Sequence, residues 1–145
     1  MTPTTLTFGA SNSKQSINKQ LANYAANQLQ NAKVNLIDLN DFEMPIYSID
    51  RENDFGKPDL ALTFHGKIAA ADALIISFAE HNGSYSAAYK NLFDWVSRID
   101  SKVFQGKSVV YLATSPGQGG AANVLASAVA SAPHFGANLK DSVSV

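Results

Sequence analysis

The stretch that decides the fold is Ala73-Leu74-Ile75-Ile76-Ser77-Phe78, followed directly by Ala79-Glu80-His81-Asn82-Gly83-Ser84-Tyr85. A short, almost unbroken apolar run is typical of a strand that is buried on both faces of a sheet. The second segment is polar and contains glycine, and a segment with helical periodicity comes after it. In α/β proteins, ligands bind in such loops at the carboxyl ends of parallel strands. We therefore expect a parallel sheet with a ligand site at one edge.

The same pattern of strand, loop and helix recurs along the chain. Strands are expected at 4–8, 33–39, 73–78, 108–113 and 139–145. Helices are expected from Tyr89 to Ile99, from Gly119 to Ala132, and from the N-cap Ser16 to Leu29. A further helix is expected to begin at Pro58, with an apolar stripe at Leu60, Phe64 and Ile68. Residues 40–57 are expected to be irregular. Alternating strands and helices imply right-handed crossovers. The prediction is one domain over residues 1–145, a doubly wound, flavodoxin-like α/β fold with five parallel strands in the order 2-1-3-4-5.

The last expected strand coincides with the end of the sequence at Val145. In the order 2-1-3-4-5, a helix after strand five lies beside the first helix and covers the same face of the sheet. That C-terminal helix is missing here. We expect that the parent protein supplies it in a further segment, or that a neighbouring subunit covers the apolar face.

Composition restricts the classes of function. The chain has 145 residues, 46% of them hydrophobic, which suffices for the core of one domain. A net charge of −1 argues against nucleic acid or an anionic membrane as a partner. Cysteine is absent, and the histidines lack metal-ligand spacing, so no metal site is expected. Neither a signal peptide nor an apolar run of about 20 residues is visible. We predict a soluble, cytoplasmic protein without a membrane partner.

The first loop, after strand one, gathers hydroxyl and amide side chains around a predicted helix start, at Ser11, Ser13, Ser16 and Asn18. The free N–H groups and the dipole of a helix N-terminus attract an anion, typically phosphate. The alternative is that these residues only cap the helix and form a turn.

The other two loops carry weaker signals. In the second, backbone groups from Glu80 to Asn82 are suited to the edge of a flat heterocycle, and His81 to stacking on it, although an ordinary loop histidine explains the residue equally well. Glu80 is a candidate general base, but we expect a structural role, in which it bonds backbone N–H groups in the turn. The third loop holds Ser115, Gly117, Gly119 and Gly120. These glycines allow close approach of the backbone to a ligand, or simply a turn that starts a helix.

Several phosphate-binding families are excluded. The first loop lacks both the Walker pattern Gly-x-x-x-x-Gly-Lys-Ser/Thr and the dinucleotide pattern Gly-x-Gly-x-x-Gly. A phospho-acceptor receiver domain needs carboxylates where strands one and three end, and these ends read Phe8-Gly9-Ala10 and Phe78-Ala79.

Taken together, the three loops resemble those of the NAD(P)H-dependent FMN reductases, a flavodoxin-like family that includes quinone, azo-dye and chromate reductases. The matching segments are Ala10–Asn18, Ala79–Ser86, Tyr89–Trp95 and Ser115–Gly120, and the loop Asp38–Tyr47 is also similar. The resemblance covers essentially the whole chain. The chain departs from the family pattern at Ser13, where arginine is frequent, at Ala79, where proline is usual, and at His81, where tyrosine is usual.

This resemblance implies FMN as cofactor, with its phosphate among Ser11, Ser13, Ser16, Ile17 and Asn18 and its ring against Ala79–Asn82 and Ser115–Gly120. It implies hydride transfer from NADPH or NADH through FMN to a quinone, a flavin or a similar small acceptor, without an obligatory protein acid or base. It also implies a homodimer or tetramer, with the loop Asn40–Lys57 at the subunit contact. Two alternatives remain: a flavodoxin-type electron carrier, which the near-neutral charge disfavours, and a cofactor-free binding protein of the same fold.

Overall fold

The computed structural model describes residues 2–145. Five parallel strands form one sheet in the order β2-β1-β3-β4-β5, which confirms the predicted flavodoxin-like topology. The strands are β1 (Thr4–Ala10), β2 (Lys33–Leu36), β3 (Ala73–Phe78), β4 (Ser108–Ala113) and β5 (Asn138–Ser144). β3 is central and pairs with β1 and β4, as its uninterrupted apolar sequence predicts.

Hydroxyl side chains determine where three of the helices begin. The helices are α1 (Ile17–Ala26), α2 (Ile49–Phe55), α3 (Asp59–Ala70), α4 (Ala87–Ser97) and α5 (Ala122–Ser131), with a 3-10 helix η1 (Leu39–Phe42). Ser16, Ser48 and Ser86 each accept a hydrogen bond from the backbone N–H three residues later. Each of these bonds satisfies a donor that the first turn otherwise leaves free.

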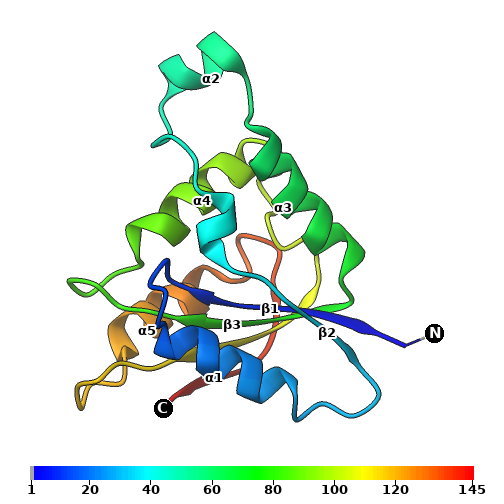
Figure 1. The fold of residues 1–145 in the computed structure, drawn as a ribbon, viewed down its shortest axis with the longest axis vertical. Helices are drawn as coiled ribbons and strands as arrows, with labels where there is room; N and C mark the ends of the chain where they lie inside the picture. The colour runs from blue at the N-terminus through cyan, green and yellow to red at the C-terminus, as the bar shows by residue number, and fades with distance from the viewer. Residues whose placement is uncertain (1) are drawn as a thin grey trace.

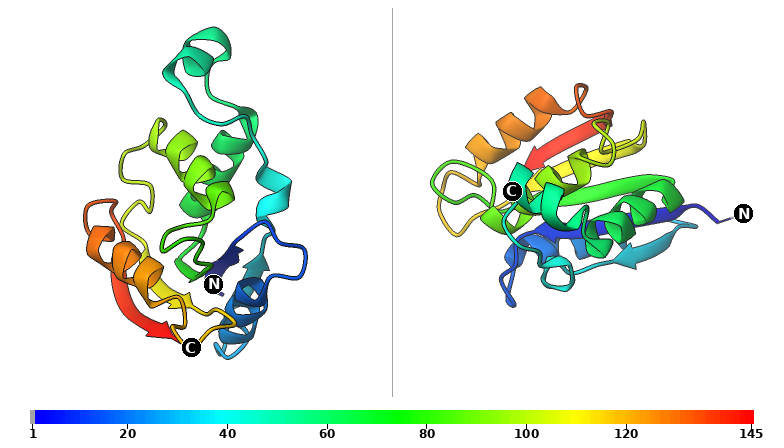
Figure 2. Two further views of the ribbon diagram at one scale, coloured as in Figure 1. Left: turned by 90° about the vertical axis from the view of Figure 1, so that its left-hand side faces the viewer. Right: turned by 90° about the horizontal axis from the view of Figure 1, so that it is seen from above.

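The helices are divided unequally between the two faces of the sheet (Figures 1 and 2). α3, α4 and α5 cover one face and enclose the main core with the inward residues of the strands. On the other face, α1 packs over Ile75 and Leu112 in a small second cluster. Val143, which pairs with Leu112, is 44% exposed on that face. Within residues 2–145 no helix follows β5, and what covers this apolar surface stays a prediction.

The structure corrects three details of the predicted elements. The second strand ends at Leu36 rather than 39, because the Asp38 side chain accepts from Asn40 N–H and begins η1. Residues 40–57 are not wholly irregular, since they contain part of η1 and all of α2. The buried stripe of α3 is Ala61, Phe64 and Ile68, whereas Leu60 is 37% exposed. Residues 61, 64 and 68 are three and four apart and therefore share one helix face.

Residues 43–57, here called the arm, project from the body of the molecule with α2 at their tip (Figure 1). α4 holds the base of the arm: Trp95 Nε1 donates to the Pro45 carbonyl oxygen at 2.8 Å, and Asn91 Oδ1 accepts from Tyr47 N–H at 2.8 Å. Beyond these bonds the arm presents apolar side chains to solvent, with Ile46 75% exposed.

The C-terminal end of β1 lies directly against the first turn of α1, and Gly9 makes this contact possible. A Cβ atom at Gly9 would lie 2.7 Å from Lys19 Cα and 2.9 Å from the Asn18 carbonyl carbon. Both are backbone atoms, so no side-chain rotation relieves the clash. The absence of a side chain at Gly9 thus fixes how closely the N-terminus of α1 approaches the edge of the sheet.

We predict that Gly9→Ala lowers the free energy of unfolding by about 3 kcal/mol, the upper end of the usual cost of overpacking. Gly66→Ala is the matched control, because a Cβ there meets nothing within 4 Å and Gly66 lies inside α3. That control should stabilise the protein by up to about 1 kcal/mol. Urea titration of both variants measures the difference, and equal midpoints would contradict the close approach.

Candidate functional site

The carboxyl-end loops of β1, β3 and β4 enclose a cavity of about 270 Å³. Its lining residues are Ser11, Ser13, Gln15, Ser16, Ile17, Asn18, Ala79, Glu80, His81, Thr114, Ser115 and Pro116. Most of the predicted site residues therefore lie together. The exceptions are Asn82, Gly117, Gly119 and Gly120, which belong to the same loops but do not line the cavity.

The N-terminus of α1 opens into this cavity with free donors. Ser16 Oγ accepts from Lys19 N–H at 3.0 Å, and the Ser16 carbonyl oxygen accepts from Gln20 N–H. The N–H groups of Ile17 and Asn18, in the turn between, pair with no acceptor among residues 2–145. Because a helix N-terminus carries partial positive charge, these two N–H groups are suited to bind an anion.

The hydroxyl groups of the first loop surround those donors. Ser11 and Ser16 are 8% and 7% exposed. Ser11 Oγ accepts from Ser13 N–H at 3.1 Å, which folds the loop back toward the helix. The C-terminal end of β1 is also bonded to the start of α4, since Ser86 Oγ donates to the Ala10 carbonyl oxygen at 2.8 Å. One hydrogen bond within the loop and one from the N-cap of α4 thus shape the loop.

Asn18 has a structural role that its sequence position did not reveal. Its side-chain oxygen accepts from Ser77 Oγ at 2.7 Å and from Thr114 N–H at 3.1 Å, and its amide donates to the Thr114 carbonyl oxygen at 3.1 Å. These bonds tie α1 to β3 and to the residue after β4. The Asn18 side chain is therefore engaged in joining these elements, and its backbone N–H is the group left available to a ligand.

The second loop is a two-residue hairpin turn. His81 and Ser84 exchange backbone hydrogen bonds of 2.9 and 3.1 Å. Asn82 and Gly83 between them have φ values of 52° and 79°. This is the geometry of a type I′ turn, for which Asn-Gly is the preferred sequence. Asn82 therefore forms the turn, while Ala79, Glu80 and His81 line the cavity.

Glu80 does accept from a backbone N–H group, but in α5 rather than in its own turn as predicted, and it thereby connects the second loop to the third. Its Oε1 accepts from Val124 N–H, in the first turn of α5, at 2.7 Å. A carboxylate at a helix N-terminus is favoured by the helix dipole. Gly120 and Ala121 both have φ of 58° and turn the chain into α5. The Gly120 carbonyl oxygen accepts from Ser144 Oγ at 2.7 Å, so this part of the loop packs on β5.

No lysine or arginine lines the cavity, and its carboxylate, Glu80, is engaged with α5. Hydroxyl groups and backbone N–H groups are therefore the donors available to a bound anion. The cavity walls beyond the α1 end are formed by the loop residues from Ala79 to His81 and from Thr114 to Pro116. This donor set fits a phosphate at one end and a flat ring system alongside the walls.

Sequence reasoning did not single out two lining residues, Gln15 and Thr114, whereas Pro116 lies within the predicted range Ser115–Gly120. Thr114 was recognisable, because it directly follows β4 and residues at strand ends face the ligand edge of a parallel sheet. Gln15 carried no comparable signal. Among residues 2–145 there is no group of three metal-ligating side chains. No helix in the same range has the length and apolar character of a membrane span.

Similar proteins of known or inferred activity were found for this chain. It is 36% identical over 111 residues to a 2-hydroxy-1,4-benzoquinone reductase from Burkholderia sp., a match that covers 75% of this chain and 58% of that protein. It is 31% identical over 75 residues to a quinone reductase of Escherichia coli K12, covering 52% of this chain and 40% of that one. The chain thus spans about half the length of the curated relatives it matches.

Solved structures show the same fold. FerB from Paracoccus denitrificans, a flavoenzyme NAD(P)H:(acceptor) oxidoreductase, superposes with a TM-score of 0.78 at 27% identity. That match covers 95% of this chain and 75% of FerB. An azoreductase from Bacillus anthracis superposes with a TM-score of 0.70 at 20% identity, covering 97% and 86%.

The family model described as NADPH-dependent FMN reductase matches residues 3–145. This range includes all five strands and every residue that lines the cavity. The chain therefore belongs to the NADPH-dependent FMN reductase family.

Proposed function

We propose that this chain binds FMN in the cavity at the sheet edge and uses it to oxidise NADPH or NADH and reduce a quinone, a flavin or a similar small acceptor. One observation carries the proposal: two unpaired N–H groups at the start of α1 lie among serine hydroxyls and beside walls suited to a flat ring. Family membership identifies FMN and NAD(P)H as the cofactor and reductant that fit such a site.

The phosphate of FMN is assigned to the N–H groups of Ile17 and Asn18, with the hydroxyls of Ser11, Ser13 and Ser16 around it. A helix N-terminus favours a phosphate through its free donors and its dipole. Ser13 stands where an arginine is frequent in the family. Neutral donors that are fixed in position replace the fixed charge here, so binding depends on the geometry of the loop.

The ring is assigned to the walls made by Ala79–His81 and Ser115–Pro116. FMN held there would supply the redox chemistry, which is hydride acceptance from the nicotinamide and electron transfer to the acceptor. The chain itself orients the cofactor. Glu80 does not supply a free base, because its carboxylate bonds α5. His81 flanks the ring at the exposed hairpin turn and contributes a contact surface.

A quinone is the acceptor class that the relatives favour. The Burkholderia relative is named for a benzoquinone and the Escherichia coli relative for quinones. Because each match spans about half of the relative, the acceptor of this protein is part of the proposal.

We predict that Ser16→Asp weakens FMN binding more than tenfold. Aspartate is as good an N-cap as serine, so α1 stays intact while a negative charge faces the phosphate. Ser101→Asp is the control, because it adds the same charge on an exposed turn. Quenching of flavin fluorescence measures both affinities. If Ser16→Asp binds FMN as tightly as the control, the phosphate lies elsewhere.

We also predict that NADPH or NADH rapidly bleaches the absorbance of the FMN-loaded protein, and that a quinone then restores it. Stopped-flow mixing of each nicotinamide with the loaded protein measures the first step and identifies the preferred donor. Dithionite serves as the control, because it reduces any bound flavin. Bleaching by dithionite but by neither nicotinamide favours the electron-carrier alternative. Absence of flavin binding favours the cofactor-free one.

We propose in addition that the arm joins two copies of the chain in a homodimer, which is also the building block of any tetramer. Ile46, Ile49 and Phe55 are 75%, 52% and 52% exposed, and α2 buries none of its residues. Three large apolar side chains on one projecting segment form an exposed patch of the kind that marks an interface.

The expected result is a dimer in sedimentation analysis at micromolar concentration, and dissociation by Ile46→Lys. Burying a lysine without a partner charge is costly, so the substituted arm should not pair. Leu29→Lys is the control, because Leu29 is also exposed (45%) but lies beyond α1, away from the arm. A wild-type monomer would contradict the proposal, and so would a dimer that Ile46→Lys leaves unchanged.

A further inference from the structure

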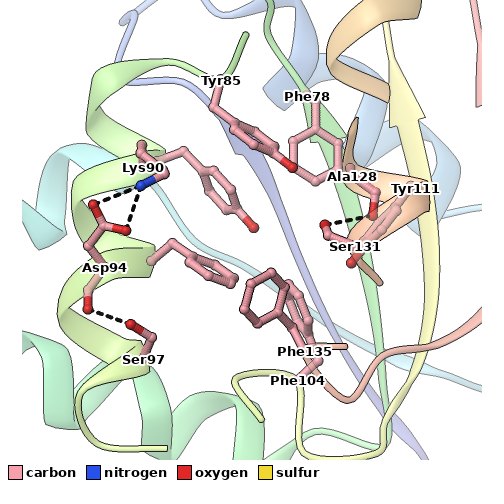
Figure 3. A pocket seen from close by; sticks show the side chains of 12 residues that line it. Phe78, Tyr85, Lys90, Asp94, Ser97, Phe104, Tyr111, Ala128, Ser131 and Phe135 are labelled. Atoms are coloured by element: carbon pink, nitrogen blue, oxygen red, sulfur yellow. Dashed lines mark hydrogen bonds and ion pairs between the residues drawn. The ribbon is translucent and has the colours of Figure 1, made fainter. Parts of the chain in front are cut away.

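A second cavity, of about 220 Å³, lies on the opposite side of β3 from α1, between α4 and α5 (Figure 3). Aromatic side chains form most of its wall. Its lining residues are Phe78, Tyr85, Tyr89, Lys90, Phe93, Asp94, Ser97, Phe104, Tyr111, Ala128, Ser131 and Phe135. None of them lines the first cavity. The FMN proposal therefore leaves this cavity without a role.

Two buried phenol groups face this cavity without partners. Tyr89 and Tyr111 are 5% and 1% exposed, and neither hydroxyl makes a hydrogen bond within residues 2–145. In the same range, every side-chain nitrogen or oxygen that is fully enclosed has a partner. The two hydroxyls are therefore not enclosed by protein and border open space. An occupant of the cavity can therefore reach both hydroxyls, and one that accepts hydrogen bonds is favoured over an apolar one.

The hydroxyls are available as neutral donors. Burial raises the pKa of Tyr89 and of Tyr111 above the ordinary value of a phenol, and the neighbouring Tyr85 raises both further. Ser131 of α5 adds a further hydroxyl to the lining, and this hydroxyl donates to the Ser127 carbonyl oxygen at 3.1 Å. In Figure 3 Tyr85, Tyr111 and Ser131 gather at one end of the cavity.

The rest of the cavity is apolar and its charged rim is balanced. Phe93 and Phe135 meet edge to face with ring centroids 4.7 Å apart, as do Phe78 and Tyr111 at 5.1 Å. Lys90, the most exposed charged group of the lining, pairs with Asp94 at 2.7 Å. The rim therefore provides no unpaired charge to attract an ion.

We propose that this cavity binds a neutral, one-ring aromatic compound that carries a carbonyl or hydroxyl oxygen. The ring would pack edge to face against the aromatic wall, and its oxygen would accept from Tyr89 and Tyr111. The size is suitable, since an apolar cavity of about 150 Å³ already holds benzene. The inference is independent of the FMN site, because the two cavities share no lining residue.

The experiment uses acetophenone as the probe, on the purified chain with and without FMN. α-Methylstyrene has nearly the same shape but has a CH₂ group in place of the oxygen, and benzoate carries a charge. Calorimetric titration and protein NMR shifts should show that acetophenone binds, that α-methylstyrene binds between about twofold and about tenfold more weakly, and that benzoate does not bind.

Substitutions locate the site. Ala128→Leu fills the cavity and should weaken acetophenone binding at least tenfold. Ala126→Leu is its matched control on the exposed side of α5 and should leave binding unchanged. Tyr111→Phe keeps the wall and removes one donor. It should abolish most of the preference for acetophenone over α-methylstyrene, even if Ala128→Leu proves too unstable to measure.

The outcomes are distinct from those of the FMN test. Ser16→Asp should leave acetophenone binding unchanged whether or not FMN binds. The proposal is wrong if acetophenone fails to bind the wild-type chain, or if Tyr111→Phe leaves the preference for the oxygen unchanged, because water then occupies the cavity or binding is merely apolar.

Discussion

The site depends on one side chain, the amide of Asn18. Its three hydrogen bonds join the first turn of α1 to Ser77 in β3 and to Thr114 after β4. Asn18 is 3% exposed, so these bonds form where water does not compete and a lost partner would leave a buried polar group unsatisfied. The three loops that surround the first cavity come from three separate strands, and Asn18 links all three.

That link works only because Gly9 lets the helix approach. With backbone atoms of Asn18 and Lys19 within 3 Å of the point where a Cβ would lie, any larger residue pushes the start of α1 outward. Asn18 would then lose its reach to Ser77 and Thr114. The helix N-terminus and its free donors are consequently held in place by a glycine on one side and an amide on the other. Because these donors are already fixed in position, little reorganisation of the protein is needed when an anion binds. This property suits a site that has no lysine or arginine.

Periodicity and strand-end rules sufficed for the strand order and for most of the cavity. The apolar runs at 73–78 and 108–113 matched β3 and β4 residue for residue, because a strand buried on both faces has a strong pattern. The end of the second strand and the helix in the arm could not be predicted from periodicity. Their structure depends on local caps at Asp38 and Ser48, and such short-range bonds compete with periodicity. The prediction that Gly120 contacts a ligand was not met by its position in the third loop, since Gly120 forms the turn into α5 and packs on β5.

The aromatic cavity could not be predicted, because it depends on how side chains from distant elements fail to fill a space. Helical spacing correctly placed Tyr89 in a helix. Nothing in that spacing indicates that its hydroxyl lacks a partner. Two consecutive residues nevertheless line different cavities: Phe78 lines the second and Ala79 lines the first. Successive side chains at the end of a strand point to opposite faces, so β3 serves as the wall between them. An occupant that presses on Phe78 therefore acts one residue away from the backbone to which the FMN ring is assigned.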